Sequence, residues 1–298
     1  MSKRRKQSRP AAGTAGGGRA VRQKVKDVFV ARPFEGLADE ADWIALRELV
    51  PAATAPLRLA PELVDKYGDR GVTLATVLPM AWPALTKPDG RIFLGLQRGT
   101  QSGDVSRDLA LSLLVALETE PGGPVAVPAL PGLGPRLQDV LSDGRLDITV
   151  REGFEFWLDE ESNDADVKAS LERANASVFP TVKLAAAAAA YWCRFPEKAH
   201  VRWVLSDDED DALAALSRLA ASGGLTLGDG TKFAGMFRAH GLLVPVWDLA
   251  RERDAGAWEA PLGQFAERYA RARTVIDDLD SAERRARQGL LGRQVTLR

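Results

Sequence analysis

Residues 72–97 read VTLATVLPMAWPALTKPDGRIFLGLQ. The segments 72–78 and 91–97 at the two ends are rich in β-branched and aromatic residues, a composition that favours strands. Between them the sequence KPDG at residues 87–90 is a strong turn signal. We therefore expect a β-hairpin with a long loop.

A helix is expected on each side of this hairpin. Downstream, Asp104 is a suitable N-cap, and an apolar stripe follows it until Pro121. Upstream, Asp39 precedes apolar residues spaced by three and four, and Pro51 ends that pattern. The two stripes consist of Trp43, Leu46 and Val50, and of Val105, Leu109, Leu113, Ala116 and Leu117.

The segment 121–135 interrupts these elements. It contains five prolines and four glycines, a spacing that no helix or central strand tolerates. We expect a linker or a domain boundary there.

A second group of elements is predicted beyond the linker. Residues 146–151 and 154–158 alternate apolar and polar side chains, which indicates a half-exposed hairpin, and a polar helix follows from Asp164. Further strands are expected over the second half of 183–194, over 201–205 and over 241–248.

The helix expected after residue 205 has the clearest start signal. Ser206 and Glu209 have the spacing of a capping box, and the acidic run 207–211 suits the positive end of a helix. Its buried stripe would be Leu213, Leu216 and Leu219. The order strand, turn, strand, helix then occurs at 72–118 and again at 188–221, which hints at a duplicated unit.

A long final helix is predicted to begin at Pro261. Its apolar positions recur at alternating spacings of three and four. They are Leu262, Phe265, Tyr269, Ala272, Ile276, Leu279, Ala286 and Leu290. Two interpretations stay open: a helix packed on its own body, which a stripe with alanines favours, or the seam of a homodimer.

Together these patterns predict an α+β protein with two mixed subdomains and a long C-terminal helix. Each subdomain would hold a small antiparallel or mixed sheet with packing helices. The expected divisions are a disordered basic tail at 1–27, a first subdomain at 28–120, a linker at 121–135, a second subdomain at 136–256 and a charged helix at 257–298.

Charge is strongly segregated along the chain, although the formal net charge is only −1. Residues 1–26 contain nine Lys or Arg and no acid, which leaves 31 basic against 41 acidic residues, a net charge of −10, in the remainder. The nine residues are Lys3, Arg4, Arg5, Lys6, Arg9, Arg19, Arg22, Lys24 and Lys26. A segment so rich in charge, Gly and Ala is expected to be disordered and suited to phosphate contacts that read no base sequence.

Several chemistries are not expected. The single cysteine, Cys193, excludes an internal disulfide and fits a reducing, cytoplasmic compartment. Neither a membrane helix nor a secretory signal is recognised. His200 and His240 have no spacing that would join them, and GDGTK at 228–232 lacks the spacing of a phosphate loop. No catalytic residue, metal ion or cofactor is therefore predicted.

One segment is a candidate small-ligand pocket. Arg238 and His240 alternate around Ala239 ahead of a buried strand, so both would face one side, where a carboxylate or phosphate could bind. Trp247 and Asp248 would line the same pocket. The alternative is an arginine paired with the acids of the body.

Several longer strings resemble a family of uncharacterised actinobacterial proteins. They are RPFEGL at 32–37, EADW at 40–43, VPAAT at 50–54 and GTKFAGMFRAHGLLVPVWD at 230–248. The likeness covers about residues 29–250 and implies no assigned activity. Some members begin with a zinc-binding motif similar to the one that ends the SecA motor, but this chain lacks the cysteines for it, so no translocase function is implied.

The sequence thus favours a noncatalytic cytoplasmic binding or adaptor protein. Its body would meet a protein partner, and residues 1–26 would make nonspecific contacts with RNA, DNA or the ribosome. A small-ligand binder or enzyme using Arg238 and His240, and a structural homodimer, remain the alternatives.

Overall fold

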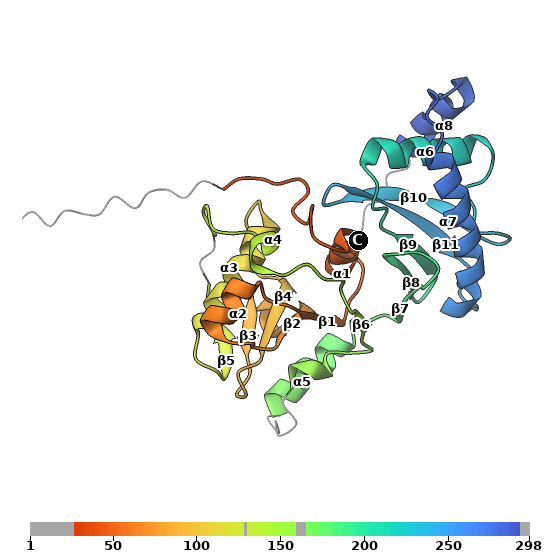
Figure 1. The fold of residues 1–298 in the computed structure, drawn as a ribbon. Helices are drawn as coiled ribbons and strands as arrows, with labels where there is room; N and C mark the ends of the chain where they lie inside the picture. Colours follow the sequence, from red (N-terminus) through yellow and green to blue (C-terminus); the bar gives the residue numbers. More distant parts are fainter. Residues whose placement is uncertain (1–26, 128–129, 159–164, 293–298) are drawn as a thin grey trace, which may run out of the picture.

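The structure, a computed structural model, describes residues 27–127, 130–158 and 165–292. In these ranges the chain forms two β-sheets with helices packed against each, so the predicted α+β class is confirmed (Figure 1). The predictions for residues 1–26 fall outside the described residues. None of the helices in the described ranges is long and apolar enough to cross a bilayer.

The first sheet is built around two parallel strands. β2 (Val72–Val77) and β4 (Ile92–Gln97) run in the same direction, so the predicted hairpin between them is wrong. A short strand that the pattern did not reveal, β3 (Ala84–Thr86), pairs antiparallel with β4 across the turn at 87–90. The turn signal was therefore correct, but it joins β3 to β4. β2 reaches its place beside β4 through a crossover that includes η1 (Pro79–Ala81).

Three further strands complete the sheet in the order β5-β3-β4-β2-β1-β6. They are β1 (Ala53–Leu57), β5 (Gly123–Val125) and β6 (Thr149–Val150). β5 lies inside the predicted linker 121–135, and its Pro124 is tolerated because β5 is an edge strand. β6 lies beyond that linker and still pairs with β1. The chain therefore passes through 121–135 without leaving the first sheet.

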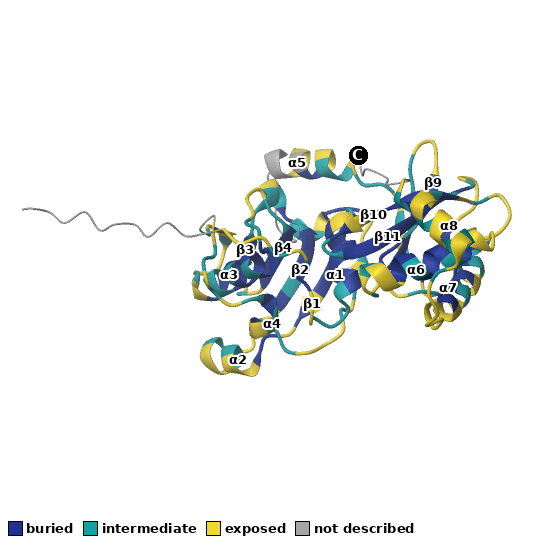
Figure 2. Cartoon of the chain, turned by 90° about the horizontal axis from the view of Figure 1, so that it is seen from above, coloured by how far each residue is buried: buried dark blue, intermediate teal, exposed yellow. Residues whose placement is uncertain are grey.

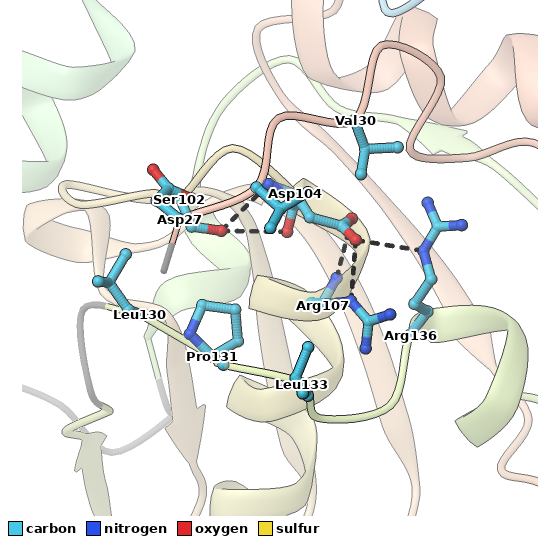
Figure 3. A pocket seen from close by; sticks show the side chains of 11 residues that line it. Asp27, Val30, Ser102, Asp104, Arg107, Leu130, Pro131, Leu133 and Arg136 are labelled. Atoms are coloured by element: carbon cyan, nitrogen blue, oxygen red, sulfur yellow. Dashed lines mark hydrogen bonds and ion pairs between the residues drawn. The ribbon is translucent and has the colours of Figure 1, made fainter. Parts of the chain in front are cut away.

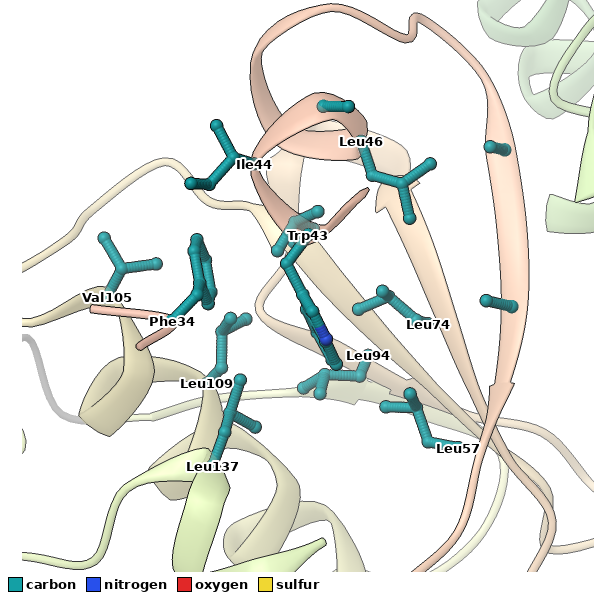
Figure 4. Close-up of a cluster of buried hydrophobic side chains, with 14 of the residues drawn as sticks. Phe34, Trp43, Ile44, Leu46, Leu57, Leu74, Leu94, Val105, Leu109 and Leu137 are labelled. Carbon is teal, nitrogen blue, oxygen red and sulfur yellow. The ribbon is translucent and has the colours of Figure 1, made fainter. Parts of the chain in front are cut away.

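One face of the first sheet packs against three helices, α1 (Glu40–Glu48), α3 (Val105–Glu118) and α4 (Leu137–Val140). Trp43 of α1 lies in the middle of this core (Figure 4). Around it Figure 4 shows Leu57, Leu74, Leu94, Leu109 and Leu137. The predicted stripes of α1 and α3 are thus the two helical walls of one core. α2 (Pro61–Tyr67) packs only at its edge, through the partly buried Leu63, Val64 and Tyr67, and has no fully buried residue.

The two predicted N-caps behave differently. Asp104 caps α3, because its carboxylate accepts hydrogen bonds from the backbone N–H groups of Ser106 and Arg107. Asp39 precedes α1 but does not cap it: its backbone is left-handed, with φ of 55°. Its carboxylate instead accepts from the backbone N–H of Leu146 at 2.9 Å. Asp39 therefore ties the start of α1 to a distant loop.

The hairpin predicted over 146–158 is not formed. Its first arm ends in β6, which pairs with β1, and its second arm contains the short 3-10 helix η2 (Glu155–Trp157). The apolar residues of this arm form an aromatic cluster, with the rings of Phe154 and Trp157 stacked at 4.5 Å. Together with α5 (Ala165–Asn175), the cluster covers part of the other face of the first sheet.

The second sheet is antiparallel throughout, in the order β10-β11-β9-β8-β7. Its strands are β7 (Thr181–Lys183), β8 (Ala190–Arg194), β9 (Ala199–Trp203), β10 (Lys232–Ala239) and β11 (Leu242–Leu249). The predicted strands in the second half of 183–194 and near 201–205 and 241–248 are confirmed. β8 and β9 form an antiparallel hairpin whereas β2 and β4 are parallel, so the strand pairing does not support a duplicated unit.

The predicted helix after residue 205 is present as α6 (Glu209–Ala221). It begins after Asp208, whose side chain makes no cap hydrogen bond. The predicted capping box of Ser206 and Glu209 is absent, because the Glu209 carboxylate is paired with Arg238.

The predicted final helix is broken into α7 (Glu259–Arg273) and α8 (Ser281–Leu291). Asp280 caps α8 through a capping box with Glu283, the residue that interrupts the apolar stripe. Most of the stripe is buried in this chain's own core: Leu262, Phe265, Tyr269, Ala272 and Leu290. A dimer seam through these residues would require that core to open. Ile276, in the break, is 97% exposed.

α1 joins the two sheets. It lies between them as a largely buried helix (Figure 2). The core around Trp43 continues onto the second sheet through Phe237, Val244 and Val246. α6 and α7 cover the opposite face of that sheet. The two sheets therefore share a hydrophobic core across α1.

Candidate functional site

Arg238 and His240, the centre of the predicted pocket, face different partners. Arg238 donates through Nε to Oε1 of Glu209 at 2.7 Å. His240 lies in the turn after β10, with φ of 46°, and its Nε2 is 2.8 Å from Oε1 of Glu48. The strand alternation on which the pocket prediction depended stops at Ala239, because β10 ends there.

The other two predicted lining residues are also apart. Trp247 is fully buried in the core between the second sheet and α7, and its Nε1 donates to the backbone O of Leu225 at 2.6 Å. Asp248 lies toward the end of β11, with Lys198 Nζ at 3.2 Å from Oδ2. The structure therefore does not gather these four residues around one pocket.

Ion pairs at this place connect α1 to the second sheet. Besides the Glu48–His240 pair, Arg32 binds Glu40 at 2.7 Å and Asp208 at 2.7 Å. The hydrogen bond from His240 holds the pKa of Glu48 below its usual value. His240 thus belongs to the contact between α1 and the second sheet, whereas Arg238 pairs with Glu209 of α6. Both pairs agree with the alternative of cations paired with the acids of the body.

A row of reactive residue types crosses the second sheet. Cys193 on β8 is directly opposite His200 on β9, which is directly opposite Asp248 on β11. Side chains at paired positions share a face, so the three lie in line. His200 Nδ1 is 3.1 Å from Asp248 Oδ1. This row was not predicted, because strand register joins residues that are far apart in the chain.

The row does not have the electrostatics of a nucleophilic site. Cys193 is 1% exposed, and burial raises the pKa of its thiol to about 11. Burial also lowers the pKa of His200. Both groups are therefore neutral near pH 7, which is the behaviour of a buried structural cysteine.

We predict that native Cys193 resists alkylation. The thiol pKa lies about two units above its reference value, so the thiolate fraction at pH 8 falls about 100-fold, and burial excludes the reagent as well. Iodoacetamide at pH 8 should modify the chain only after unfolding in urea, as measured by mass spectrometry. Rapid modification of the folded chain would contradict this assignment.

The other candidate motifs have structural roles. At GDGTK, Oγ1 of Thr231 donates to the backbone O of Gly228 at 2.7 Å, which closes an ordinary turn. In the acidic run, Asp207 contacts Arg273 and Tyr269, and Asp210 contacts Arg287. Among the described residues no group of three or more His, Cys, Asp or Glu side chains could hold a metal ion.

A buried charged pair at the end of β4 was not predicted. Arg98 and Asp108 are 4% and 1% exposed, with Nη1 and Oδ1 3.7 Å apart. Burial lowers the pKa of Arg98 and raises that of Asp108. Arg98 Nη1 donates to the backbone O of Asp108 and to Ser112 Oγ, so the pair holds the loop after β4 against α3.

A small cavity of about 160 Å³ lies beside the first described residues, Asp27, Val28 and Val30 (Figure 3). The first described residues are fixed to the loop before α3: Gly103 N donates to Asp27 Oδ1, and Val30 N donates to Gly103 O. Asp104 lies between Arg107 at 3.1 Å and Arg136 at 3.4 Å. Hydrogen bonds therefore hold the start of the described chain against the loop before α3.

These features define a two-sheet α+β protein in which the predicted reactive groups take part in structural contacts. The chain belongs to a family of unknown function, DUF5926, whose model matches residues 33–298. The resemblance to an uncharacterised family is thereby confirmed. Neither the curated proteins nor the solved structures gave a match. Because the match begins at residue 33, the basic tail lies outside it.

Proposed function

We propose that this chain is a noncatalytic cytoplasmic binding protein that attaches to nucleic acid through residues 1–26 and presents its body to a protein partner. The observation that supports the attachment is the charge segregation, nine basic residues and no acid in the tail against a net charge of −10 in the remainder. A polyanion attracts the tail and repels the body, so contact is directed to one end of the chain.

The arrangement of the body supports a noncatalytic role. The thiol of Cys193 is buried and protonated, and His240 is engaged in the contact between α1 and the second sheet. Arg238, the cation predicted to bind a ligand, is paired with Glu209. The stripe that suggested a homodimer is mostly buried within the chain. These contacts favour the noncatalytic binding role over the two alternative functions.

The test is fluorescence anisotropy of a labelled RNA with the full chain and with a chain whose nine tail Lys and Arg are glutamine. Nine charges engage about six to nine phosphates, so we expect the full chain to bind at least about tenfold more tightly in 50 mM salt. The advantage should disappear in high salt as counterion release loses its driving force.

Two controls separate the effect of tail charge from the effects of tail length and residue order. Deleting residues 1–27 should weaken binding as much as neutralising the tail does. Reordering the tail with its charges kept should change little, since phosphate contacts read no sequence. Equal affinity of the full and the neutralised chain at low salt would remove the tail from the proposal.

A further inference from the structure

The face of the first sheet that is turned away from α3 carries a groove of about 740 Å³. Thr73 and Phe93 lie on this face, because they alternate along β2 and β4 with Leu74 and Leu94 of the core. The aromatic cluster at 154–157 covers only part of it. The lining residues are Thr54, Thr73, Lys87, Pro88, Asp89, Arg91, Phe93, Arg151, Phe156 and Leu158.

The groove is basic on an acidic body. Among the described residues its lining contains Lys87, Arg91 and Arg151 against one carboxylate, Asp89. Lys87 is 3% exposed and donates to the backbone O of Trp157, so Arg91 and Arg151 are the cations open to a ligand. A second cavity, of about 350 Å³ beside Trp43, contains two arginines and two aspartates and is balanced. Positive charge gathered in one hollow of a negatively charged body favours an anionic ligand at that place.

Arg151 is the cation best placed to meet such a ligand. Its side chain is exposed, and its Nε and Nη2 donate to Oγ1 of Thr54 at 3.2 and 3.1 Å. In the described ranges it forms no ion pair with a carboxylate. Thr54 thus orients the guanidinium, while its remaining donors stay available for a phosphate. Arg91 pairs with Asp89 yet is 60% exposed.

Two aromatic rings, Phe93 and Phe156, line the same groove. Phe156 lines the groove and is only partly buried, and its ring lies nearly parallel to that of Phe93, with centroids 6.3 Å apart. A nucleic-acid base stacks on such a ring with little sequence preference. Residues 1–26 contain no aromatic side chain. The groove therefore offers the stacking contact that the tail lacks.

We propose that this groove binds a nucleotide unit of single-stranded nucleic acid, with its phosphate on Arg151 and its base against Phe156. The proposal rests on the proposed function, since it adds a second contact to the strand that the tail attracts. A duplex is a poor occupant because its bases are already stacked inside the helix. Backbone charge and one accessible base are what the groove recognises.

The experiment uses the full chain with its nine tail Lys and Arg replaced by glutamine, so that the groove alone is measured. The probe is a fluorescein-labelled ten-nucleotide oligouridylate in low salt. Arg151→Glu should weaken binding about tenfold, and Phe156→Leu, which keeps an apolar side chain, about fivefold. The control Arg251→Glu makes the same charge change at an exposed residue outside the groove lining and should stay within about twofold.

Each further outcome has a defined meaning. If Arg151→Glu and Arg251→Glu weakened binding equally, with unchanged melting temperatures, the groove would not be the binding site, and the result for the tail would still stand. If uridine monophosphate displaced the probe at the same concentration as the unlabelled oligonucleotide, the groove would be a site for a free nucleotide, and its assignment to a nucleic-acid strand would be wrong. If a ten-base-pair duplex bound as tightly as the single strand, stacking of a base on Phe156 would be contradicted. No binding by the unmodified full chain would overturn both the groove and the proposed function.

Discussion

Replacing Asp42 with alanine is expected to lower the free energy of unfolding by about 3 kcal/mol. Asp42 lies on α1 and is 5% exposed. Its Oδ1 accepts from the Tyr191 hydroxyl at 2.8 Å, and its Oδ2 from Lys183 Nζ at 2.8 Å. Burial raises the pKa of Tyr191, so its hydroxyl remains a donor. The substitution leaves that donor and the ammonium group of Lys183 without their acceptor, which is the main cost.

Urea unfolding followed by tryptophan fluorescence measures this effect. Two further variants are compared with Asp42→Ala. Tyr191→Phe removes one hydrogen bond and should cost about 1 kcal/mol. Asp42→Asn keeps an acceptor, so its cost should lie between those of Tyr191→Phe and Asp42→Ala. Lys183 is 32% exposed and regains water, so the cost stays toward the lower end of the range for buried pairs. A loss below that of Tyr191→Phe would show that Asp42 does not join the two sheets.

Replacing Trp247 with alanine is expected to cost about 4 kcal/mol, the largest effect predicted for this chain. Trp247 has no exposed surface, and its ring meets those of Phe265 at 4.9 Å and Phe233 at 5.8 Å. The substitution would open a cavity between the second sheet and α7, and leave the backbone O of Leu225 without its donor.

Trp247→Phe is the matched control, because it keeps a ring and loses mainly the hydrogen bond. Its cost should be about half that of alanine. Both are measured by urea unfolding with circular dichroism, since the fluorophore itself changes. If Trp247 instead lined an open pocket, alanine would leave stability nearly unchanged, and that result would refute its place in the core.

Local signals predicted most helices and strands correctly. The cap at Asp104, the stripe of α3, the turn at 87–90 and the buried strand β11 each depend on neighbouring residues, so they were readable in the sequence. The break between α7 and α8 was missed because the apolar spacing continues across it, although Asp280 and Glu283 form a capping box there. Glu283, the only interruption of the stripe, was the available signal.

Contacts between distant parts of the chain were not readable in this way. β3 forms the antiparallel hairpin with β4, and β2 pairs with β4 in parallel. Which of the two strands forms the hairpin depends on the whole sheet and is not visible in any short stretch of sequence. The groove of the first sheet brings Arg151 and Phe156 beside Thr73 and Arg91 through the same pairing. No spacing along the chain marks that group.

What residue order alone established is therefore local and compositional: the α+β class, most helix and strand positions, and the separation of nine positive charges from an acidic remainder. Tertiary structure decided which charges are neutralised and which stay open, pairing Arg238 and His240 with carboxylates while leaving Arg151 without one in the described ranges. The physical reason is that hydrogen bonds and ion pairs act over a few ångströms, and only folding brings residues distant in the chain within that range.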